Sequence, residues 1–239
     1  MQFEVLDDAD SVARRAAAYI AADARVAIAA NGRYAMAFSG GHTPWIMLRA
    51  LAHEDVPWPH VDVCQVDERA APDGDPDRNL THLRESLLQH VPLPPHNVHA
   101  MPVESGDLES AAAQYALTLQ QAAGSPPMLD LVHLGLGPDG HTASLVPGDP
   151  VLDVFDVDVA LTGVYQGRRR MTLTYPALNR ARRVLWVVTG REKVGMLRRL
   201  MDADSSIPAG RVRQEDALVI ADRAAAGGLA AEHKAGGHT

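Results

Sequence analysis

The stretch DLVHLGLGPDGHTASLVPG, residues 130–148, begins as an apolar strand and then changes character. Its apolar run ends in a turn that is rich in glycine and contains Asp139 and His141. A strand that runs into such a loop is typical of an open α/β sheet, in which ligands bind beyond the carboxyl ends of the strands. The fold, and the role of a histidine at this place, therefore depend on which other segments end beside this loop.

Segments of strand and helix character alternate along the chain. Apolar residues at helical spacing predict helices at 11–30, 44–52, 80–90, 107–123 and 191–202. Apolar or alternating runs predict strands at 34–40, 61–66, 97–101, 129–137, 157–165, 170–175, 183–190 and 216–222. We therefore expect one α/β domain spanning residues 1–239. Its sheet should be Rossmann-like and mostly parallel, flanked by helices on both faces, with some strands of the second half pairing antiparallel at an edge.

Composition and charge argue against several classes of protein. The chain of 239 residues is 46% hydrophobic, which supplies an ample core, and its net charge of −8 argues against a nucleic-acid partner. The apolar stretches are shorter than a membrane span and residues 1–20 lack the apolar centre of a signal peptide, so we expect a cytoplasmic protein with no membrane partner. The single cysteine, Cys64, is interpreted as a core residue of a buried strand.

The loop FSGGHTP, residues 38–44, follows a predicted strand. Thr43 suits a helix N-cap and Pro44 suits a first helical turn, so backbone N–H groups near Gly40 and Gly41 would point into the loop as an anion cradle. The loop matches neither the dinucleotide-binding fingerprint nor the Walker loop. An ordinary tight turn between strand and helix accounts for these residues equally well.

A second unusual loop, DERAAPDGDPDRNL at 67–80, begins with an acid, an acid and a base. Asp67 and Arg69 could hold a polar substrate, although a solvated loop with a local salt bridge is the commoner explanation of such a triplet. The aspartates that follow do not form a calcium loop, because Arg78 stands where an EF-hand needs Gly and Arg84 stands where it needs Glu.

The glycine-rich turn after residue 134 places a carboxylate and an imidazole two residues apart. A single histidine is usually structural, but this setting favours His141 as a general base with Asp139 beside it. A metal site is the competing interpretation. It is disfavoured because the chain has no H-E-x-x-H or C-x-x-C motif and because His42, His133 and His141 lack ligand spacing.

Basic residues gather in one part of this acidic protein. Arg168 and Arg169 are interpreted as part of a solvated face. Arg170 stands directly before an alternating strand and is better placed to reach a pocket. Lys193 lies just inside a predicted helix that follows a strand and Gly190, so it too is a candidate for binding an anion.

Several of these stretches together carry a family resemblance. They are FSGGHTP, DERAAPDGDPDRN, LGLGPDGHTASLVPG, RMTLTYPALNRARRVLWVVTGREK and IPAGRV, in this order between residues 38 and 212. The combination resembles the 6-phosphogluconolactonase family, which shares its fold with glucosamine-6-phosphate deaminases and isomerases. The resemblance implies hydrolysis of 6-phospho-D-glucono-1,5-lactone to 6-phosphogluconate in the oxidative pentose phosphate pathway. It also implies that no cofactor is used. The expected partner is the sugar phosphate lactone, and no obligate protein partner is inferred.

The resemblance also implies a role for each matching residue. His141 matches the general base, and Asp67 and Arg69 match an acid and base of the site. The phosphate-binding positions match Arg170, Lys193, Gly40, Gly41 and Thr43. Whether Asp139 or Asp67 supports His141, and which group stabilises the oxyanion, stay open from the sequence alone. Two departures, Val146 in place of the frequent Phe and Arg78 in place of the commoner Ser, remove no chemical group that the reaction needs.

Two other classes of function remain from the sequence. Deaminases of the same fold resemble D-G-H-I-A-F-N-E-P, with a proton-transferring Glu where this chain has Val146. The next carboxylate, Asp149, is expected to point elsewhere. A sugar-phosphate-binding regulator would usually carry a DNA-binding segment such as a helix-turn-helix, and none is recognisable in this sequence. Lactone hydrolysis is therefore the expected activity.

Overall fold

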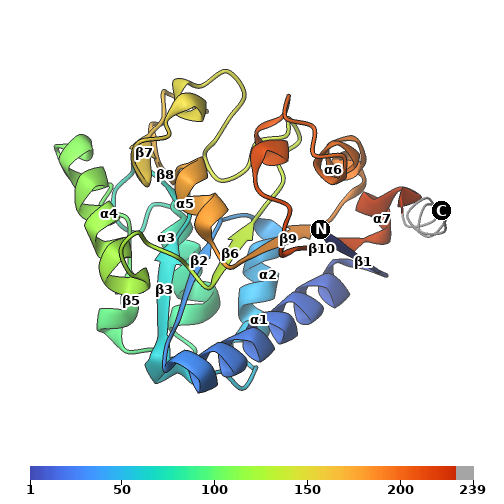
Figure 1. Cartoon of the computed structure of the whole chain (residues 1–239), viewed down its shortest axis with the longest axis horizontal. Helices are drawn as coiled ribbons and strands as arrows, with labels where there is room; N and C mark the ends of the chain where they lie inside the picture. The colour runs from blue at the N-terminus through green and yellow to red at the C-terminus, as the bar shows by residue number, and fades with distance from the viewer. Residues whose placement is uncertain (230–239) are drawn as a thin grey trace.

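A computed structural model describes residues 1–229, and two β-sheets form its frame (Figure 1). The larger sheet is entirely parallel and has the order β1-β10-β9-β6-β2-β3-β5. Its strands are β1 (Gln2–Leu6), β2 (Tyr34–Phe38), β3 (Val61–Gln65), β5 (Val98–His99), β6 (Leu131–Leu134), β9 (Arg183–Val188) and β10 (Ala217–Asp222). The smaller sheet is antiparallel, with the order β4 (Asp67–Arg69), β8 (Arg170–Leu173) and β7 (Val159–Leu161).

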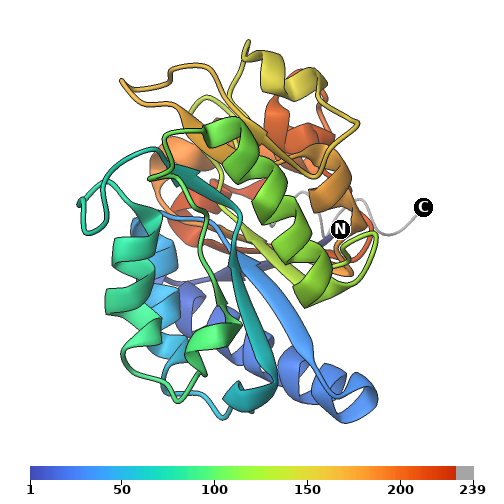
Figure 2. The same ribbon diagram turned by 90° about the vertical axis from the view of Figure 1, so that its left-hand side faces the viewer.

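Helices cover both faces of the larger sheet (Figures 1 and 2). One face packs against α1 (Ala9–Asn31), α2 (His42–Leu51) and α3 (Asn79–Leu83), which continues into a π-helical turn at Arg84–Leu88. The other face packs against α4 (Leu108–Ala123), α5 (Tyr175–Arg180), α6 (Val194–Met201) and α7 (Arg223–Ala226). Short 3₁₀ turns occupy Trp58–His60, Pro95–Asn97, Pro150–Asp153, Arg191–Lys193 and Pro208–Arg211.

Strand β2 shows why the sheet is covered on both sides. All five of its residues are buried, and successive side chains enter opposite cores. Met36 belongs to the core beside α1 and α2, whereas Ala35 and Ala37 belong to the core beside α4. A strand without a polar face does not lie at a surface. The near-continuous apolar run in the sequence therefore indicates a central parallel strand. Cys64 on β3 is fully buried in the α4 core, as predicted.

The predicted fold class is confirmed, and the antiparallel strands have a specific place. The chain leaves β3 at Val66, whose N–H donates to Phe38 O at 3.0 Å and whose carbonyl accepts from Leu173 N at 2.8 Å. Val66 thus joins the two sheets. The antiparallel strands form a separate small sheet beyond the carboxyl ends of β2 and β3, not an extension of the larger sheet's edge (Figure 1). In this position the small sheet faces the loops that follow the parallel strands.

Every predicted helix and strand has a counterpart, with bounds shifted by a few residues. The sequence did not indicate β1, β4, α5 or α7. Strand β1 is a short edge strand whose residues are only partly buried, so its apolar pattern is weak. Strand β4 consists of the three charged residues read as a loop, and its burial depends on partners that are distant in the sequence.

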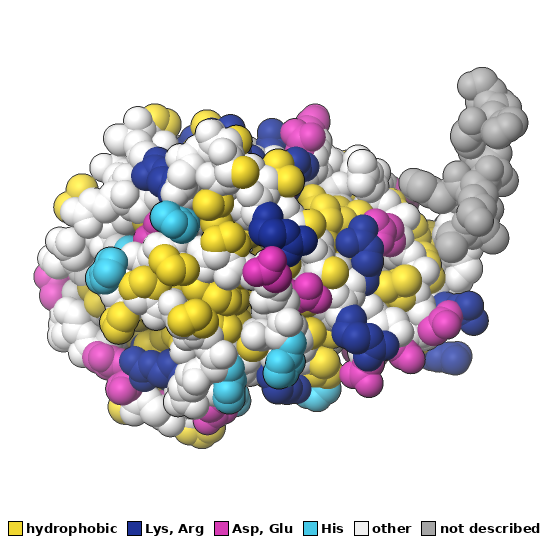
Figure 3. All heavy atoms as spheres, turned by 90° about the horizontal axis from the view of Figure 1, so that it is seen from below, with side chains coloured by type: hydrophobic (Ala, Val, Ile, Leu, Met, Phe, Trp, Pro, Cys, Tyr) yellow, Lys and Arg dark blue, Asp and Glu magenta, His cyan; other side chains and the backbone are white. Residues whose placement is uncertain are grey.

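The face of the molecule drawn in Figure 3 carries charges of both signs. On the face shown in Figure 3, Lys and Arg side chains lie next to Asp and Glu side chains, and the described part of that face has no continuous basic surface. Among the helices of residues 1–229, none combines the length and the apolar character needed to cross a membrane.

Candidate active site

A hollow of about 230 Å³ lies where the parallel strands end and the small sheet begins. We call it the inner hollow. It is lined by Ser39, Gly40, Gly41, Asp67, Arg69, Asn79, Gly135, Leu136, Gly137, Pro138, His141, Ala143, Arg170 and Lys193. Seven of the predicted site residues are among them. Of the other two, Asp139 contacts His141, and Thr43 lines an adjoining hollow together with Gly40, Gly41 and Lys193.

His141 and Asp139 form a hydrogen-bonded pair. The imidazole Nδ1 lies 2.5 Å from Asp139 Oδ1, and the backbone N–H of His141 donates to the same oxygen at 3.1 Å. Partial burial opposes ionisation of Asp139, but the hydrogen bonds and the adjacent imidazole outweigh it and lower the pKa of this carboxyl. With Nδ1 donating its proton to a carboxylate, Nε2 keeps the lone pair that a general base needs.

Glycines are required in this loop because the imidazole and Ile207 pack against its backbone. A Cβ on Gly137 would overlap the His141 ring. Gly140 has φ of +83°, and a Cβ there would lie 2.7 Å from Ile207 Cβ. The turn is closed by a hydrogen bond from Gly137 N to His141 O of 2.8 Å. Side chains at these positions would displace the histidine, which explains the glycine-rich sequence.

The acid–acid–base triplet is strand β4, so the solvated-loop interpretation is wrong. Side chains alternate along a strand, and Glu68 points away from Asp67 and Arg69 into the protein. Glu68 is fully buried, lies 3.2 Å from the Arg78 guanidinium, and accepts the backbone N–H groups of Asn79 and Leu80 at 2.8 Å. It therefore fixes the start of α3 to β4, a structural role that the sequence analysis missed.

Asp67 and Arg69 face the inner hollow from β4. Asp67 is 4% exposed and accepts the Ser144 hydroxyl at 2.6 Å, not a bond from His141. Of the two carboxylates left open by the sequence, Asp139 is thus the one bound to the imidazole. Arg69 donates to Asn79 Oδ1 at 2.5 Å and to Asp77 O at 3.0 Å. The accepting atoms are a backbone carbonyl oxygen and an amide oxygen, and neither of them is charged. The positive charge of Arg69 therefore remains available to the hollow.

Arg170 is a buried guanidinium without a carboxylate partner among the described residues. It is 5% exposed, donates to Gln166 Oε1 at 3.0 Å and to Ser144 Oγ at 3.5 Å, and its Nε has no partner there. It stands opposite Arg69 in the β4–β8 register. Burial lowers the pKa of Arg170, and the Arg69 charge lowers it further while the Asp67 charge partly offsets both. Two neighbouring cations in a partly buried setting favour a bound anion.

The glycine loop differs in detail from its prediction. Helix α2 begins at His42 with Gly41 as its N-cap and no side-chain cap, so Thr43 is not the N-cap. Gly41 has φ of +132°, a conformation that threonine does not adopt readily. The Thr43 hydroxyl instead hydrogen bonds to the Thr189 hydroxyl at 2.6 Å. The first N–H groups of α2 have no partner within the helix, and Gly41, His42 and Thr43 line the adjoining hollow, so these groups are available to a bound anion.

Lys193 reaches the same hollow from the turn that precedes α6. That turn begins after Gly190, which has φ of +99°, and Lys193 lines the hollow beside the glycine loop. Within residues 1–229, Lys193 forms no ion pair. A flexible ammonium without a carboxylate partner is suited to a phosphate or to a developing oxyanion.

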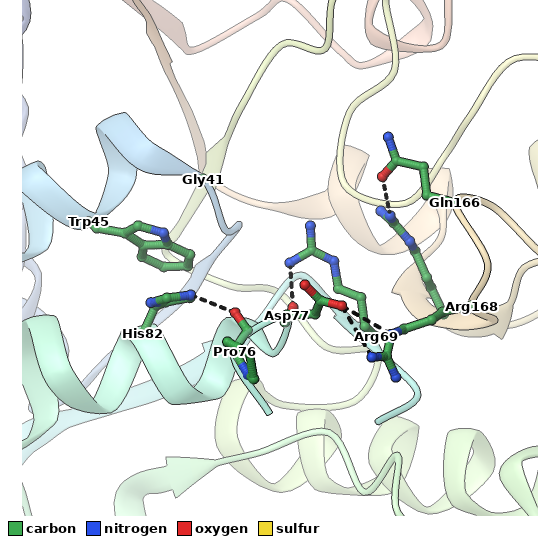
Figure 4. A pocket seen from close by; sticks show the side chains of 9 residues that line it. Gly41, Trp45, Arg69, Pro76, Asp77, His82, Gln166 and Arg168 are labelled. Atoms are coloured by element: carbon green, nitrogen blue, oxygen red, sulfur yellow. Dashed lines mark hydrogen bonds and ion pairs between the residues drawn. The ribbon is translucent and has the colours of Figure 1, made fainter. Parts of the chain in front are cut away.

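A second hollow of about 370 Å³, which we call the outer hollow, adjoins the first (Figure 4). The two share Gly41, Arg69 and Arg170, and the outer hollow is further lined by Trp45, Pro76, Asp77, His82, Gln166 and Arg168. Trp45 and His82 stack on one side with ring centroids 5.1 Å apart, and Gln166 and Arg168 lie on the other.

The two arginines before Arg170 have different surroundings, although both side chains stay partly exposed, as expected of a solvated face. Arg168 lines the outer hollow and pairs with Asp75 and Asp77 at 3.1 and 3.2 Å. Arg169 is exposed and pairs with Glu109 at 3.1 Å, as a solvated residue would. The two successive residues of the chain point to opposite sides, as alternation near a strand requires.

The site contains no group that suggests a metal. Among the described residues, no cluster of three or more His, Cys, Asp or Glu side chains has an arrangement that could hold an ion. His133 shows what a histidine outside the site does. It is fully buried on β6, and burial lowers its pKa to about 3, so it stays neutral within the core.

Comparison with known proteins places the chain in a family. Residues 7–220 match the family described as glucosamine-6-phosphate isomerases/6-phosphogluconolactonase. The chain belongs to this family, and the resemblance seen in the sequence is confirmed.

Curated relatives carry the lactonase name. The chain is 35% identical over 240 residues to 6-phosphogluconolactonase of Mycobacterium tuberculosis, covering 95% of this chain and 97% of that protein. It is 42% identical over 161 residues to 6-phosphogluconolactonase of Synechocystis, covering 66% and 67%. It is 41% identical over 165 residues to the human GDH/6PGL endoplasmic bifunctional protein, of which the match spans 21%.

Solved structures share the fold. 6-Phosphogluconolactonase from Thermotoga maritima superposes with a TM-score of 0.83 at 27% identity, covering 92% of this chain and 98% of that chain. A monomeric glucosamine-6-phosphate deaminase superposes with a TM-score of 0.81 at 20% identity, covering 95% and 99%. Because both kinds of enzyme share this fold, the fold alone does not separate their activities, and the separation has to come from the site.

Four polar contributors to the site were missed at the sequence level: Asn79, Ser144, Tyr165 and Gln166. Ser144 stands in the same motif as His141, and its distance of three residues along the loop is the signal that could have found it. Tyr165 and Gln166 lie at a hairpin tip whose Gln-Gly pair marks a tight turn. Such a turn is visible in the sequence, but which residues it faces is not.

Proposed function

We propose that this protein hydrolyses 6-phospho-D-glucono-1,5-lactone to 6-phospho-D-gluconate. One observation carries the proposal: a hydrogen-bonded His–Asp pair and two cations meet at one hollow. The pair is His141 with Asp139, and the cations are Arg170 and Lys193, neither of which forms an ion pair with a described carboxylate. The His141–Asp139 pair suits the activation of water. The cations suit a phosphorylated substrate. The names of the relatives support the same substrate.

The reaction needs one general base that later acts as an acid. Neutral His141 removes a proton from water through Nε2, and the water oxygen forms a bond to the lactone carbonyl carbon C1. The carbonyl oxygen takes up negative charge, which a cation or the N–H groups of the glycine loop stabilise. When the bond between C1 and the ring oxygen breaks, protonated His141 returns the proton to that oxygen. Water is consumed and no cofactor is required.

Asp139 keeps the imidazole in the reactive tautomer. Its carboxylate accepts the Nδ1 proton and stays ionised because its pKa is lowered. During the reaction it also stabilises the positive charge that the imidazole acquires. Asp67 has a different role, since its bonds go to Ser144 and Asn79 and hold the small sheet against the His141 loop.

The phosphate group serves as a handle. It does not react, but binding it to the cations of the hollow positions C1 next to His141, and binding energy used in this way lowers the barrier. Arg170 and Lys193 are the proposed phosphate ligands, with Arg69 and the N–H groups at Gly40 and Gly41 completing the anion site. Thr43 contributes through its bond to Thr189, which links the glycine loop to the end of β9.

The site disfavours the deaminase activity of the same fold. Val146, at the position of the proton-transferring Glu, is buried and apolar, so it exchanges no protons. Asp149 accepts the backbone N–H groups of Val151 and Gly163 at 2.9 Å and does not line the inner hollow, as the sequence suggested. In the part of the described loop that follows His141, no carboxylate therefore stands in for the missing Glu.

Several expectations from the sequence remain proposals. They are the organisation of residues 1–239 as one domain, the cytoplasmic location, and the absence of nucleic-acid, membrane and obligate protein partners. The pairing of β1 with β10 supports the first, because it brings the start of the chain beside the end of the sheet.

The direct test is an assay for lactone hydrolysis corrected for spontaneous ring opening, run beside an assay for ammonia release from glucosamine-6-phosphate. We expect enzymatic hydrolysis of the phosphorylated lactone and no ammonia. Ammonia formation at a comparable rate would contradict the proposal. Introducing Glu at position 146 should not by itself create a deaminase, because the rest of the pocket would still fit a lactone.

A further inference from the structure

The tip of the β7–β8 hairpin is a tight turn that reaches both halves of the site. Tyr165 and Arg168 close it through two backbone hydrogen bonds of 3.0 and 3.3 Å. Between them, Gln166 has φ of +51° and Gly167 has φ of +80°. Two consecutive left-handed residues define the type of turn that follows the twist of an antiparallel hairpin. The turn therefore holds Tyr165 and Gln166 in fixed positions.

Tyr165 contacts the guanidinium of the anion site. The Arg170 Cζ atom lies 4.8 Å from the centroid of the Tyr165 ring, within cation–π distance. Gln166, the next residue of the turn, accepts from Arg170 Nη2 at 3.0 Å. Both partners are neutral. They hold the guanidinium in one plane without cancelling its charge, as an anion-binding group requires.

The same tyrosine contacts the catalytic pair. Its hydroxyl donates to Asp139 Oδ2 at 3.4 Å, while Oδ1 of that carboxylate accepts from His141. The edge of one ring meets the face of the other, with the Tyr165 and His141 centroids 5.8 Å apart at 67°. Among the described residues, Tyr165 is thus in contact with Asp139, His141 and Arg170 together.

We propose that Tyr165 is a positioning residue that couples the phosphate-binding guanidinium to the His141–Asp139 pair, so that the bound handle and the general base keep one relative geometry. The proposal rests on the proposed lactonase function. The hydroxyl limits rotation of the Asp139 carboxylate and so the orientation of the imidazole. The ring face keeps Arg170 from bending toward that carboxylate, where a direct ion pair would neutralise both groups.

Two variants separate the two contacts. Tyr165→Phe removes the hydroxyl and keeps the ring, so kcat should fall about two- to tenfold on both the phosphorylated lactone and gluconolactone, the range of one hydrogen bond. Tyr165→Leu removes the ring as well, so KM for the phosphorylated lactone should additionally rise about three- to tenfold, with KM for gluconolactone unchanged. In Tyr165→Phe the acid limb of kcat on gluconolactone should also move.

Val164→Ala is the matched control, because Val164 belongs to the same hairpin and is 72% exposed. It should match the wild type in all these values. A purely structural role of Tyr165 would change the thermal midpoint and move neither the substrate-specific KM nor the pH profile. If Tyr165→Leu is too unstable to assay, Tyr165→Phe decides, because it preserves the ring and its packing.

The proposal is overturned if Tyr165→Phe and Tyr165→Leu both behave as Val164→Ala, or if Tyr165→Leu raises KM equally for the two lactones. Calorimetric binding of 6-phosphogluconate reads the Arg170 contact without turnover, and it should be weaker in Tyr165→Leu than in Val164→Ala. A wild type that hydrolyses neither lactone contradicts the proposed function and the coupling to the base with it. Weakened phosphogluconate binding in Tyr165→Leu would then still support the contact with Arg170.

Discussion

The loop after β6 and the small antiparallel sheet border the same hollow, but they are built in different ways. The loop is one continuous stretch in which glycines let His141 fold back onto Gly137. The small sheet combines β4 with the β7–β8 hairpin, which lies far from β4 in the sequence, and it holds the buried cation Arg170 between neutral partners. A local loop presents the base, and a non-local assembly presents the charge that holds the substrate. Damage to each should therefore have a different kinetic signature.

The largest effect is expected at the loop. His141→Asn removes the general base, so kcat should fall about 10²- to 10⁴-fold on the phosphorylated and the unphosphorylated lactone alike. Steady-state assays on both substrates measure this, and circular dichroism checks that the fold is kept. Wild-type turnover in this variant would remove His141 from the mechanism.

The second prediction tests whether the small sheet depends on its buried ion pair. Glu68→Gln removes the charge that faces Arg78 and the two backbone N–H groups at the start of α3, while Arg78 keeps its half-exposed partner Glu104. Hydrogen bonds to a buried charged group contribute about 1.5–3 kcal/mol, so the free energy of unfolding should fall by about this amount. Chemical denaturation should show this loss. Glu109→Gln, which breaks the exposed pair with Arg169, is the control and should cost less than about 1 kcal/mol. Equal losses in the two variants would show that β4 is not anchored through Glu68.

Much of the loop could be predicted from the sequence, and much of the small sheet could not. The strand before the loop, the glycines of the loop, and Asp139 and His141 are neighbours in the sequence, so pattern and composition indicated them directly. Strand β4 was read as a solvated loop because its three residues are charged. Its burial depends on Arg78, Asn79 and Ser144, which the chain brings together only on folding. The N-cap predicted at Thr43 lies two residues earlier in the structure, because Gly41 takes the cap.

The third prediction sharpens the contrast through the substrate. Arg170→Met or Lys193→Met should lower kcat/KM for the phosphorylated lactone about 10- to 10²-fold, since a charge-assisted contact contributes roughly 1.5–3 kcal/mol. Gluconolactone, which lacks the phosphate, should be affected far less. Arg169→Met is the matched control, because this neighbouring arginine is exposed and outside the hollow. Equal losses on both substrates would show that these cations do not bind phosphate.

The smallest effect concerns pH and is best seen on gluconolactone. The base must be neutral, so kcat should fall on acidification through a single protonation, because the lowered pKa keeps Asp139 ionised over the same range. The phosphorylated substrate would obscure this, since a phosphate monoester loses its second proton near pH 6. Asp139→Asn should move the acid limb to lower pH, because the imidazolium loses its carboxylate. An unmoved limb would show that Asp139 does not stabilise that charge.

The ratio of kcat/KM for the phosphorylated lactone to kcat/KM for gluconolactone, measured in the wild type, His141→Asn and Arg170→Met, tests the division of labour most directly. We expect His141→Asn to lower both values and to leave their ratio within about twofold of the wild type, because the base acts on either lactone. Arg170→Met should instead reduce the ratio about tenfold or more. A ratio that falls in His141→Asn and stays constant in Arg170→Met would contradict the assignment of base and phosphate handle to these two regions.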